Sequence, residues 1–202
     1  MPKNFLQHET VFMAERFSPV LYKTTTGEEV ANYLQSLPAN TVLAASFEGV
    51  EVVGASFLRT AFNGIRHHAV NGRLRTPMVA FTDLEPEVNL ELQMVLESPC
   101  TNMPALVVAN GHGIKLQTHR ERISTAFEAA RQLTAENEVF TVADVAETIG
   151  AGTPDVNTRL NLLRQGGAVT MWGKSQNGRV RYTYRSLTDA DLEKCAKNGS
   201  TD

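Results

Sequence analysis

The chain has 202 residues, 42% of them hydrophobic and 20% charged, and a formal net charge of −3. This size and composition suit one medium domain plus one small domain with a sizeable buried core. No run of about eighteen apolar residues occurs and the start, Met1–Phe5, is too polar for a signal peptide, so we exclude a membrane-spanning protein and expect a soluble, cytoplasmic one.

The first hundred or so residues alternate predicted helices and strands, which is typical of an α/β domain. Thr26–Glu29 has the sequence of a capping box and opens a helix that stops at Pro38. The nearly continuous apolar run Thr41–Phe47 is typical of an interior strand, and Ser56–Ile65 has the apolar spacing of a helix. The same alternation then predicts a strand at Pro77–Phe81, a helix at Pro86–Leu96, a strand at Ala105–Val108 and, after a glycine turn, a segment at Ile114–Gln117.

The segment Val42–Phe57 combines a strand, a Gly-Val turn and a loop of small residues that carries Ser56 at the start of a helix. With this pattern, the stretch from Val11 to Leu96 resembles the STAS domain of anti-sigma-factor antagonists, and more closely the STAS-like domains of bacterial regulators. In those antagonists the loop reads Asp-Ser-Ser-Gly, and a partner kinase phosphorylates the second serine. The resemblance places Ser56 at that position, whereas Gly54 replaces the aspartate and Phe57 replaces the glycine.

Ser56 therefore has two candidate roles. It is a regulatory site if the resemblance extends to phosphorylation, and it is a helix N-cap if its hydroxyl accepts a hydrogen bond from a free backbone N–H. The segment Gly49–Ser56 also has glycines spaced as in a phosphate loop. Ala55 stands where such a loop needs its lysine, however, and this excludes nucleotide binding there.

Residues that could support catalysis or metal binding are few. Cys100 and Cys195 lack the paired spacing of a zinc site or a disulfide framework, and none of the five histidines lies four positions from another ligand on a helix. Ser56 and the cysteines have no flanking pattern that predicts a base, and the acids of Asp83–Glu87 are explained by the start of a helix. We expect no catalytic residue, no metal and no cofactor, and therefore no enzyme.

The region Phe140–Arg185 predicts two helices followed by a hairpin. A short helix begins after Thr141 and stops at a Gly-Ala-Gly break. A second helix has Thr153 as its N-cap and Pro154 at its first position, and it ends at a Gly-Gly pair. Two strand-like runs, separated by turn residues that include an Asn-Gly pair, then predict a hairpin of Ala168–Gly173 and Arg179–Arg185.

Charge is concentrated in this region. Thr153–Arg185 holds six basic residues and one acid, so it carries +5 in a chain of net charge −3. Lys and Arg side chains neutralise DNA phosphates, and this patch therefore predicts nucleic-acid binding, although a solvated face of a protein-interaction domain has the same pattern. Alternation along the second strand predicts a core face of Val180, Tyr182 and Tyr184 and an opposite face of Arg179, Arg181, Thr183 and Arg185.

With a lead-in helix at Arg122–Leu133, this region resembles the winged helix-turn-helix family of bacterial regulators. The resemblance implies that the helix Thr153–Gln165 enters the major groove and that the hairpin lies along the phosphate backbone. Base-edge contacts are expected from the outer face of that helix, at Asp155, Asn157, Thr158 and Asn161. Phosphate contacts are expected from the basic residues Arg159, Arg164, Lys174, Arg179, Arg181 and Arg185.

We therefore expect an α/β protein with a STAS-like N-terminal domain at residues 1–117, a small C-terminal winged helix-turn-helix domain at 118–187 and a C-terminal tail at 188–202. The expected function is a DNA-binding transcriptional regulator from a bacterium or phage. Its N-terminal domain senses, docks on a protein partner or forms a homodimer, and its main partner is double-stranded DNA. A protein-protein adaptor, and a mobile-element inhibitor that fills another protein's nucleic-acid groove with its basic wing, fit the same residues.

Overall fold

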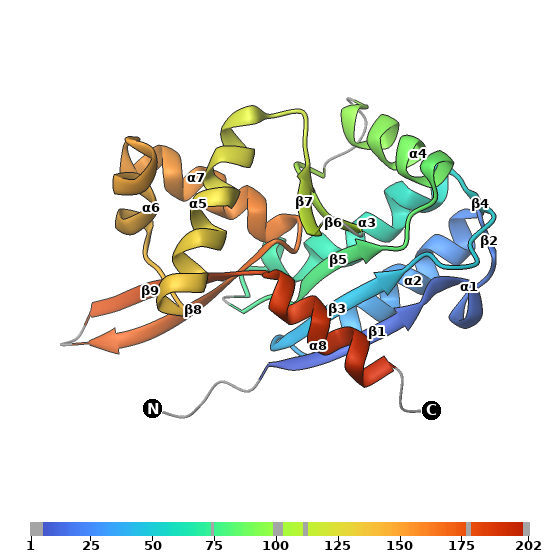
Figure 1. The fold of residues 1–202 in the computed structure, drawn as a ribbon, viewed down its shortest axis with the longest axis horizontal. Coiled ribbons are helices and arrows are strands. Elements are labelled where there is room, and N and C mark those ends of the chain that lie inside the picture. Colours follow the sequence, from blue (N-terminus) through green and yellow to red (C-terminus); the bar gives the residue numbers. More distant parts are fainter. Residues whose placement is uncertain (1–5, 74, 99–102, 111–112, 177–178, 200–202) are drawn as a thin grey trace.

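The computed structural model describes residues 6–73, 75–98, 103–110, 113–176 and 179–199. The chain has a mixed α/β fold with a mostly parallel central sheet (Figure 1). In chain order the elements are β1 (Gln7–Phe12), α1 (Met13–Arg16), β2 (Val20–Leu21), α2 (Thr24–Ser36), β3 (Thr41–Ser46), β4 (Val52–Val53), α3 (Ala55–Val70), β5 (Met78–Thr82), α4 (Pro86–Glu97), β6 (Leu106–Asn110), β7 (Gly113–Gln117), α5 (Glu121–Asn137), α6 (Val142–Ile149), α7 (Thr153–Gln165), β8 (Val169–Gln176), β9 (Arg179–Ser186) and α8 (Asp189–Gly199).

The central sheet has the strand order β1-β3-β5-β6-β7. The first four strands are parallel, and β7 pairs antiparallel with β6. Every residue of β3 is buried, as expected for a strand that is covered on both faces and reads as a continuous apolar run. Because the four strands run the same way, their carboxyl ends meet at one edge of the sheet.

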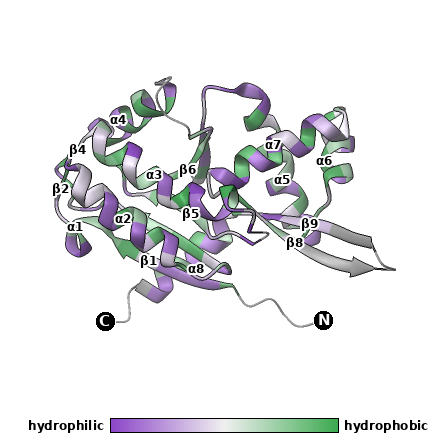
Figure 2. Ribbon diagram, turned by 180° about the vertical axis from the view of Figure 1, so that it is seen from behind, coloured by the Kyte–Doolittle hydropathy of each residue, from purple (hydrophilic) through white to green (hydrophobic). Residues whose placement is uncertain are grey.

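Helices α2, α3 and α4 cover one face of the sheet, as the view from behind shows (Figure 2). Their apolar residues form a core with alternate side chains of β3, β5 and β6, for example Leu43, Phe81 and Leu106. Helices α2 and α3 approach each other closely at Gly64, where a Cβ atom would lie 2.6 Å from the carbonyl oxygen of Ala31. This helix pair therefore depends on a residue without a side chain.

The opposite face of the sheet packs against the C-terminal part of the chain. We call α5, α6, α7 and the β8–β9 hairpin the C-terminal unit; its core, with Phe127 and Leu160, is continuous with sheet residues such as Val42. The backbone N–H of Val79 donates to the carbonyl of Gly167 at 2.9 Å, which joins β5 to the end of α7. Helix α8 then lies across β1 and β3 (Figure 1).

Several elements differ from the sequence-based expectation. The sequence analysis did not predict β1, because a six-residue strand of mixed polarity has no clear period. It also did not predict α1, β2 and β4, which have four residues or fewer and are too short to show a period. Helix α3 continues past the predicted end to Val70. Residues 189–199, expected within a tail, form α8, whose Cys195 is buried and donates to the carbonyl of Val42 at 3.5 Å.

Among the described residues, no helix is both long and apolar enough to cross a bilayer.

Candidate nucleic-acid interface

Helix α7 is anchored by its apolar side chains, as predicted. Val156, Leu160 and Leu163 are buried, and the helix ends at Gly166, followed by Gly167 with φ of 70°. The N-cap is Gly152, one residue before the predicted Thr153, because Thr153 already has helical geometry. The local sequence thus gives the right helix with its start displaced by one position.

The first two turns of α7 face outward. Asp155, Asn157 and Thr158 are exposed, as predicted for a surface that contacts another molecule. The Thr158 hydroxyl donates to the Pro154 carbonyl at 3.0 Å, and the Tyr184 hydroxyl of β9 donates to Asn157 Oδ1 at 3.5 Å. The exposed half of α7 therefore lies beside the hairpin.

Arg159 is largely held within the protein. Its guanidinium forms an ion pair with Asp155 and donates to the carbonyl of Arg122 at 3.2 Å, which leaves the side chain only 12% exposed. The hydrogen bond from Arg159 also holds the pKa of Asp155 below its ordinary value. Arg159 orients the first turns of α7 rather than extending toward a phosphate.

Arg164 is buried, and its expected phosphate contact is therefore wrong. The residue is 7% exposed, and its guanidinium donates to the Arg73 carbonyl at 2.6 Å and to Asn161 Oδ1 at 3.0 Å. Burial lowers the pKa of Arg164. The reason is that the last turns of α7 pack against α3, so Arg164 joins two elements and half-buried Asn161 helps to hold it instead of facing a base.

Arg185 also does not contribute a free positive charge to the expected cationic face. Its Nη2 donates to the buried carboxylate of Asp191 at 2.8 Å, and its side chain is 17% exposed. Sequence spacing places Arg185 in line with Arg179 and Arg181, but it cannot show that α8 supplies an acid at this point of β9. Arg185 is an internal contact between the hairpin and α8.

The hairpin has both predicted strands, but β8 continues to Gln176, three residues past its predicted end at Gly173. Its register pairs Lys174 with Arg181 and Gln176 with Arg179. The side chains of residues 173–181 lie outside the described residues, and with them the contacts expected of Lys174, Arg179 and Arg181. Tyr184 is buried and stacks on Phe140 with ring centroids 6.0 Å apart, as predicted for the core face. Tyr182 is 44% exposed, so the core face does not extend that far.

Ser56 does not cap its helix. The N-cap of α3 is Gly54, and no side chain accepts a hydrogen bond there; Ser56 is exposed in the first turn. The capping box expected at Thr26 is absent in the same way, because α2 already begins at Thr24 after the N-cap Lys23. Thr141 does cap α6, and it forms a capping box with Asp144.

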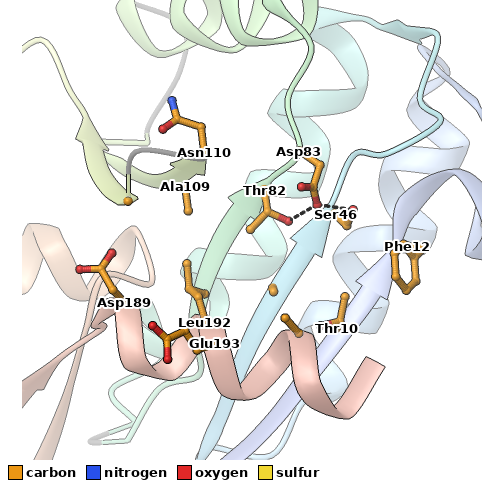
Figure 3. A pocket seen from close by; sticks show the side chains of 13 residues that line it. Thr10, Phe12, Ser46, Thr82, Asp83, Ala109, Asn110, Asp189, Leu192 and Glu193 are labelled. Carbon is orange, nitrogen blue, oxygen red and sulfur yellow. Dashed lines mark hydrogen bonds between the residues drawn. The ribbon is translucent and has the colours of Figure 1, made fainter. Parts of the chain in front are cut away.

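Sequence reasoning missed a pocket at the carboxyl ends of the parallel strands. It lies between the sheet and α8 and has a volume of about 600 Å³ (Figure 3). Ser46 at the end of β3 donates to Asp83 Oδ2 at 2.6 Å, and Thr82 at the end of β5 donates to the same oxygen at 2.8 Å. The available signal was the polar residue at the end of each buried strand, where α/β sheets bind ligands.

In the described part of the chain, no group of three or more His, Cys, Asp or Glu residues is arranged to hold a metal ion. Comparison of the chain with known protein families, with curated proteins and with solved structures gave no match. The functional argument therefore depends on the geometry alone.

Proposed function

We propose that the chain is a transcriptional regulator in which a STAS-like domain is joined to a winged helix-turn-helix, and that it binds double-stranded DNA. The order of three helices followed by an antiparallel hairpin in the C-terminal unit supports the winged-helix part. The parallel sheet with α2, α3 and α4 on one face supports the STAS-like part. In this proposal α7 is the recognition helix and β8–β9 is the wing.

The exposed first half of α7 is the observation that carries the proposal. A recognition helix reads base edges with its N-terminal residues, and those are the residues of α7 that face outward: Asp155, Asn157 and Thr158. The buried second half, fixed against α5 and α3, holds that end in a constant position. Asn157 has an amide that suits a bidentate contact with adenine.

Fewer basic side chains are available for phosphate contacts than the sequence predicted. Arg159 and Arg185 are paired with acids and Arg164 is buried, which leaves Lys174, Arg179 and Arg181 of the hairpin as the proposed phosphate contacts. Each neutralised phosphate contributes about −0.9 to the slope of log K against log salt concentration, so three contacts give a slope of about −3. Six contacts would give a slope of about −5.

The test is the affinity of the full chain for a random-sequence duplex at several salt concentrations between about 50 and 200 mM. We expect a slope near −3, and the double variant Arg179→Ala/Arg181→Ala should reduce its magnitude by about two units. The matched control is Arg59→Ala/Lys115→Ala, which removes two exposed cations from α3 and β7 and should leave the slope unchanged.

Two results would overturn the proposal. One is the absence of measurable binding to any duplex at low salt. The other is an equal loss of slope in the hairpin variant and in the control, because this would show that the affinity comes from overall charge rather than from the hairpin.

A further inference from the structure

The pocket at the carboxyl ends of the strands has the dimensions of a ligand site. Its volume of about 600 Å³ falls within the range of small-molecule pockets, about 300–1,000 Å³. The ends of β1, β3, β5 and β6 form one side and α8 forms the other (Figure 3). It is separate from the exposed half of α7, and nothing in the proposed DNA contact uses it.

The lining is apolar with acidic groups. Apolar walls come from Phe12 of β1, Leu192 and Ala196 of α8, and the alanines of β3 and β6. Three carboxylates line the same pocket, those of Asp83, Asp189 and Glu193, and none of its described lining residues is a Lys, Arg or His. An apolar cavity whose only charges are negative favours a ligand with a positive charge on an apolar body.

The three carboxylates differ in how far they are already satisfied. Asp189 accepts from the backbone N–H of Ile114 at 2.9 Å and pairs with Arg131 at 2.6 Å, so its charge is balanced. Asp83 receives hydroxyl hydrogen bonds from Ser46 and Thr82, which orient the carboxylate without neutralising it. Glu193 is exposed, and within the described residues its carboxylate has no hydrogen-bond partner.

We propose that this pocket binds a small organic cation, a protonated amine carried on an apolar body. The ammonium group pairs with the oriented carboxylate of Asp83, and the body packs against Phe12, Leu192 and Ala196. Glu193, on the α8 side of the pocket, adds a second negative charge that favours a cation (Figure 3). Charge-assisted hydrogen bonds from an ammonium to oriented carboxylates are stronger than neutral ones, so they provide the selectivity for an amine. The proposal does not depend on DNA binding, and a failure of one leaves the other testable.

The probe is 2-phenylethylamine, titrated into the full chain by calorimetry near neutral pH. 2-Phenylethanol is the neutral analogue and 3-phenylpropanoate is the anionic one. We expect the amine to bind at least about tenfold more tightly than the alcohol, because a neutral hydroxyl cannot form the charge-assisted hydrogen bond that an ammonium forms with a carboxylate. We expect no binding of the anion.

Variants then locate the site. Glu193→Gln should weaken amine binding about fivefold, since it removes one of the two negative charges of the lining that no described cation balances, while leaving the fold unchanged. Glu28→Gln, an exposed glutamate on α2 across the sheet, is the matched control and should bind as the parent does. Ala196→Phe fills the pocket from α8 and should weaken binding at least about tenfold, with melting temperature measured alongside to show that the chain is folded.

Absence of amine binding to the parent overturns the proposal. Equal affinity for the amine and the alcohol also overturns it, because it would show an apolar pocket without charge selectivity. Amine binding that is unchanged in both Glu193→Gln and Ala196→Phe places the amine elsewhere and likewise rejects this site.

Discussion

Arg185 of β9 donates a hydrogen bond of 2.8 Å to the buried carboxylate of Asp191 in α8. His8 Nε2 of β1 lies 3.2 Å from the same oxygen, and the Thr188 hydroxyl donates to the other oxygen at 2.8 Å. One carboxylate therefore holds together the hairpin, the first strand of the sheet and α8. It joins the C-terminal unit to the sheet through polar contacts as well as through the shared core.

Asp191→Asn should lower the free energy of unfolding by about 3 kcal/mol at pH 7, because it leaves Arg185 without its charged partner. Burial alone would raise the pKa of Asp191, but the hydrogen bond and charge of Arg185, with the bonds from Thr188 and His8, hold the pKa below its ordinary value. A lowered carboxyl pKa stabilises the fold above the unfolded pKa of about 3.9, and this stabilisation is lost as the pH falls through the folded value. Urea unfolding of parent and variant at pH 7, 5 and 3 should show the difference shrinking only at the acid end, and a difference that grows there would contradict the assignment.

The two predicted caps should behave differently. Thr141→Ala removes a capping-box hydrogen bond and should cost about 1 kcal/mol of unfolding free energy. Ser56→Ala should change it by less than about 0.5 kcal/mol, since the Ser56 side chain is exposed and Gly54 is the cap. Chemical denaturation of both variants checks this, and a loss at Ser56 as large as that at Thr141 would reject the capping assignment.

Gly64→Ala should destabilise the chain by about 1–3 kcal/mol. Alanine is the better helix former by about 1 kcal/mol, but its Cβ would press against the Ala31 backbone of α2. The neighbouring exposed position gives the control: Asn63→Ala should be neutral or stabilising. Melting of both variants separates helix propensity from packing, and a more stable Gly64→Ala chain would show that α2 and α3 can move apart.

Arg164→Ala should lower the free energy of unfolding by about 2 kcal/mol, because charged hydrogen bonds to the Arg73 carbonyl and to Asn161 are lost. The salt slope of DNA binding should stay at the parental value. This pair of measurements distinguishes a buried structural arginine from a phosphate contact, for which the slope would fall by about one unit and stability would hardly change.

Asn157→Ala should reduce affinity for a selected duplex by about 1–3 kcal/mol and affinity for random DNA far less. Asn63, an exposed asparagine on α3 outside the proposed interface, serves as the matched control, and Asn63→Ala should leave both affinities unchanged. Duplexes selected from a random library provide the preferred site. An equal loss on both duplexes would show that Asn157 contacts only the DNA backbone.

Local patterns predicted the elements whose own residues determine them. The apolar runs of β3 and β5, the stripe of α7 and the paired strands β8 and β9 are each set by side chains within one segment, and the structure confirms them. The Asn-Gly pair expected at the turn lies outside the described residues. The candidate site was harder to predict, because partners distant in sequence changed the roles of its arginines. Arg164 is held by a carbonyl 91 positions away, and Arg185 by an acid on a helix that the sequence reading did not predict.

Helix α8 did leave a sequence signal. Thr188 and Asp191 are spaced as a helix start, and Leu192 and Cys195 lie three apart on one apolar face. The helix is short and mostly polar, and its burial depends on the open face of β1 and β3, which no local pattern reveals. The strand-end pocket was missed for the same reason, since α8 forms one of its walls.

The placement of α8 also bears on the order of assembly. Its contacts with β1 connect residues more than 180 positions apart, as in the 3.1 Å bond from Asn198 to the His8 carbonyl. Because α8 is the last element to be synthesised, the face of β1 and β3 that it covers stays bare until the whole C-terminal unit has emerged. A nascent chain stopped before α8 is therefore expected to present an apolar surface to chaperones and proteases.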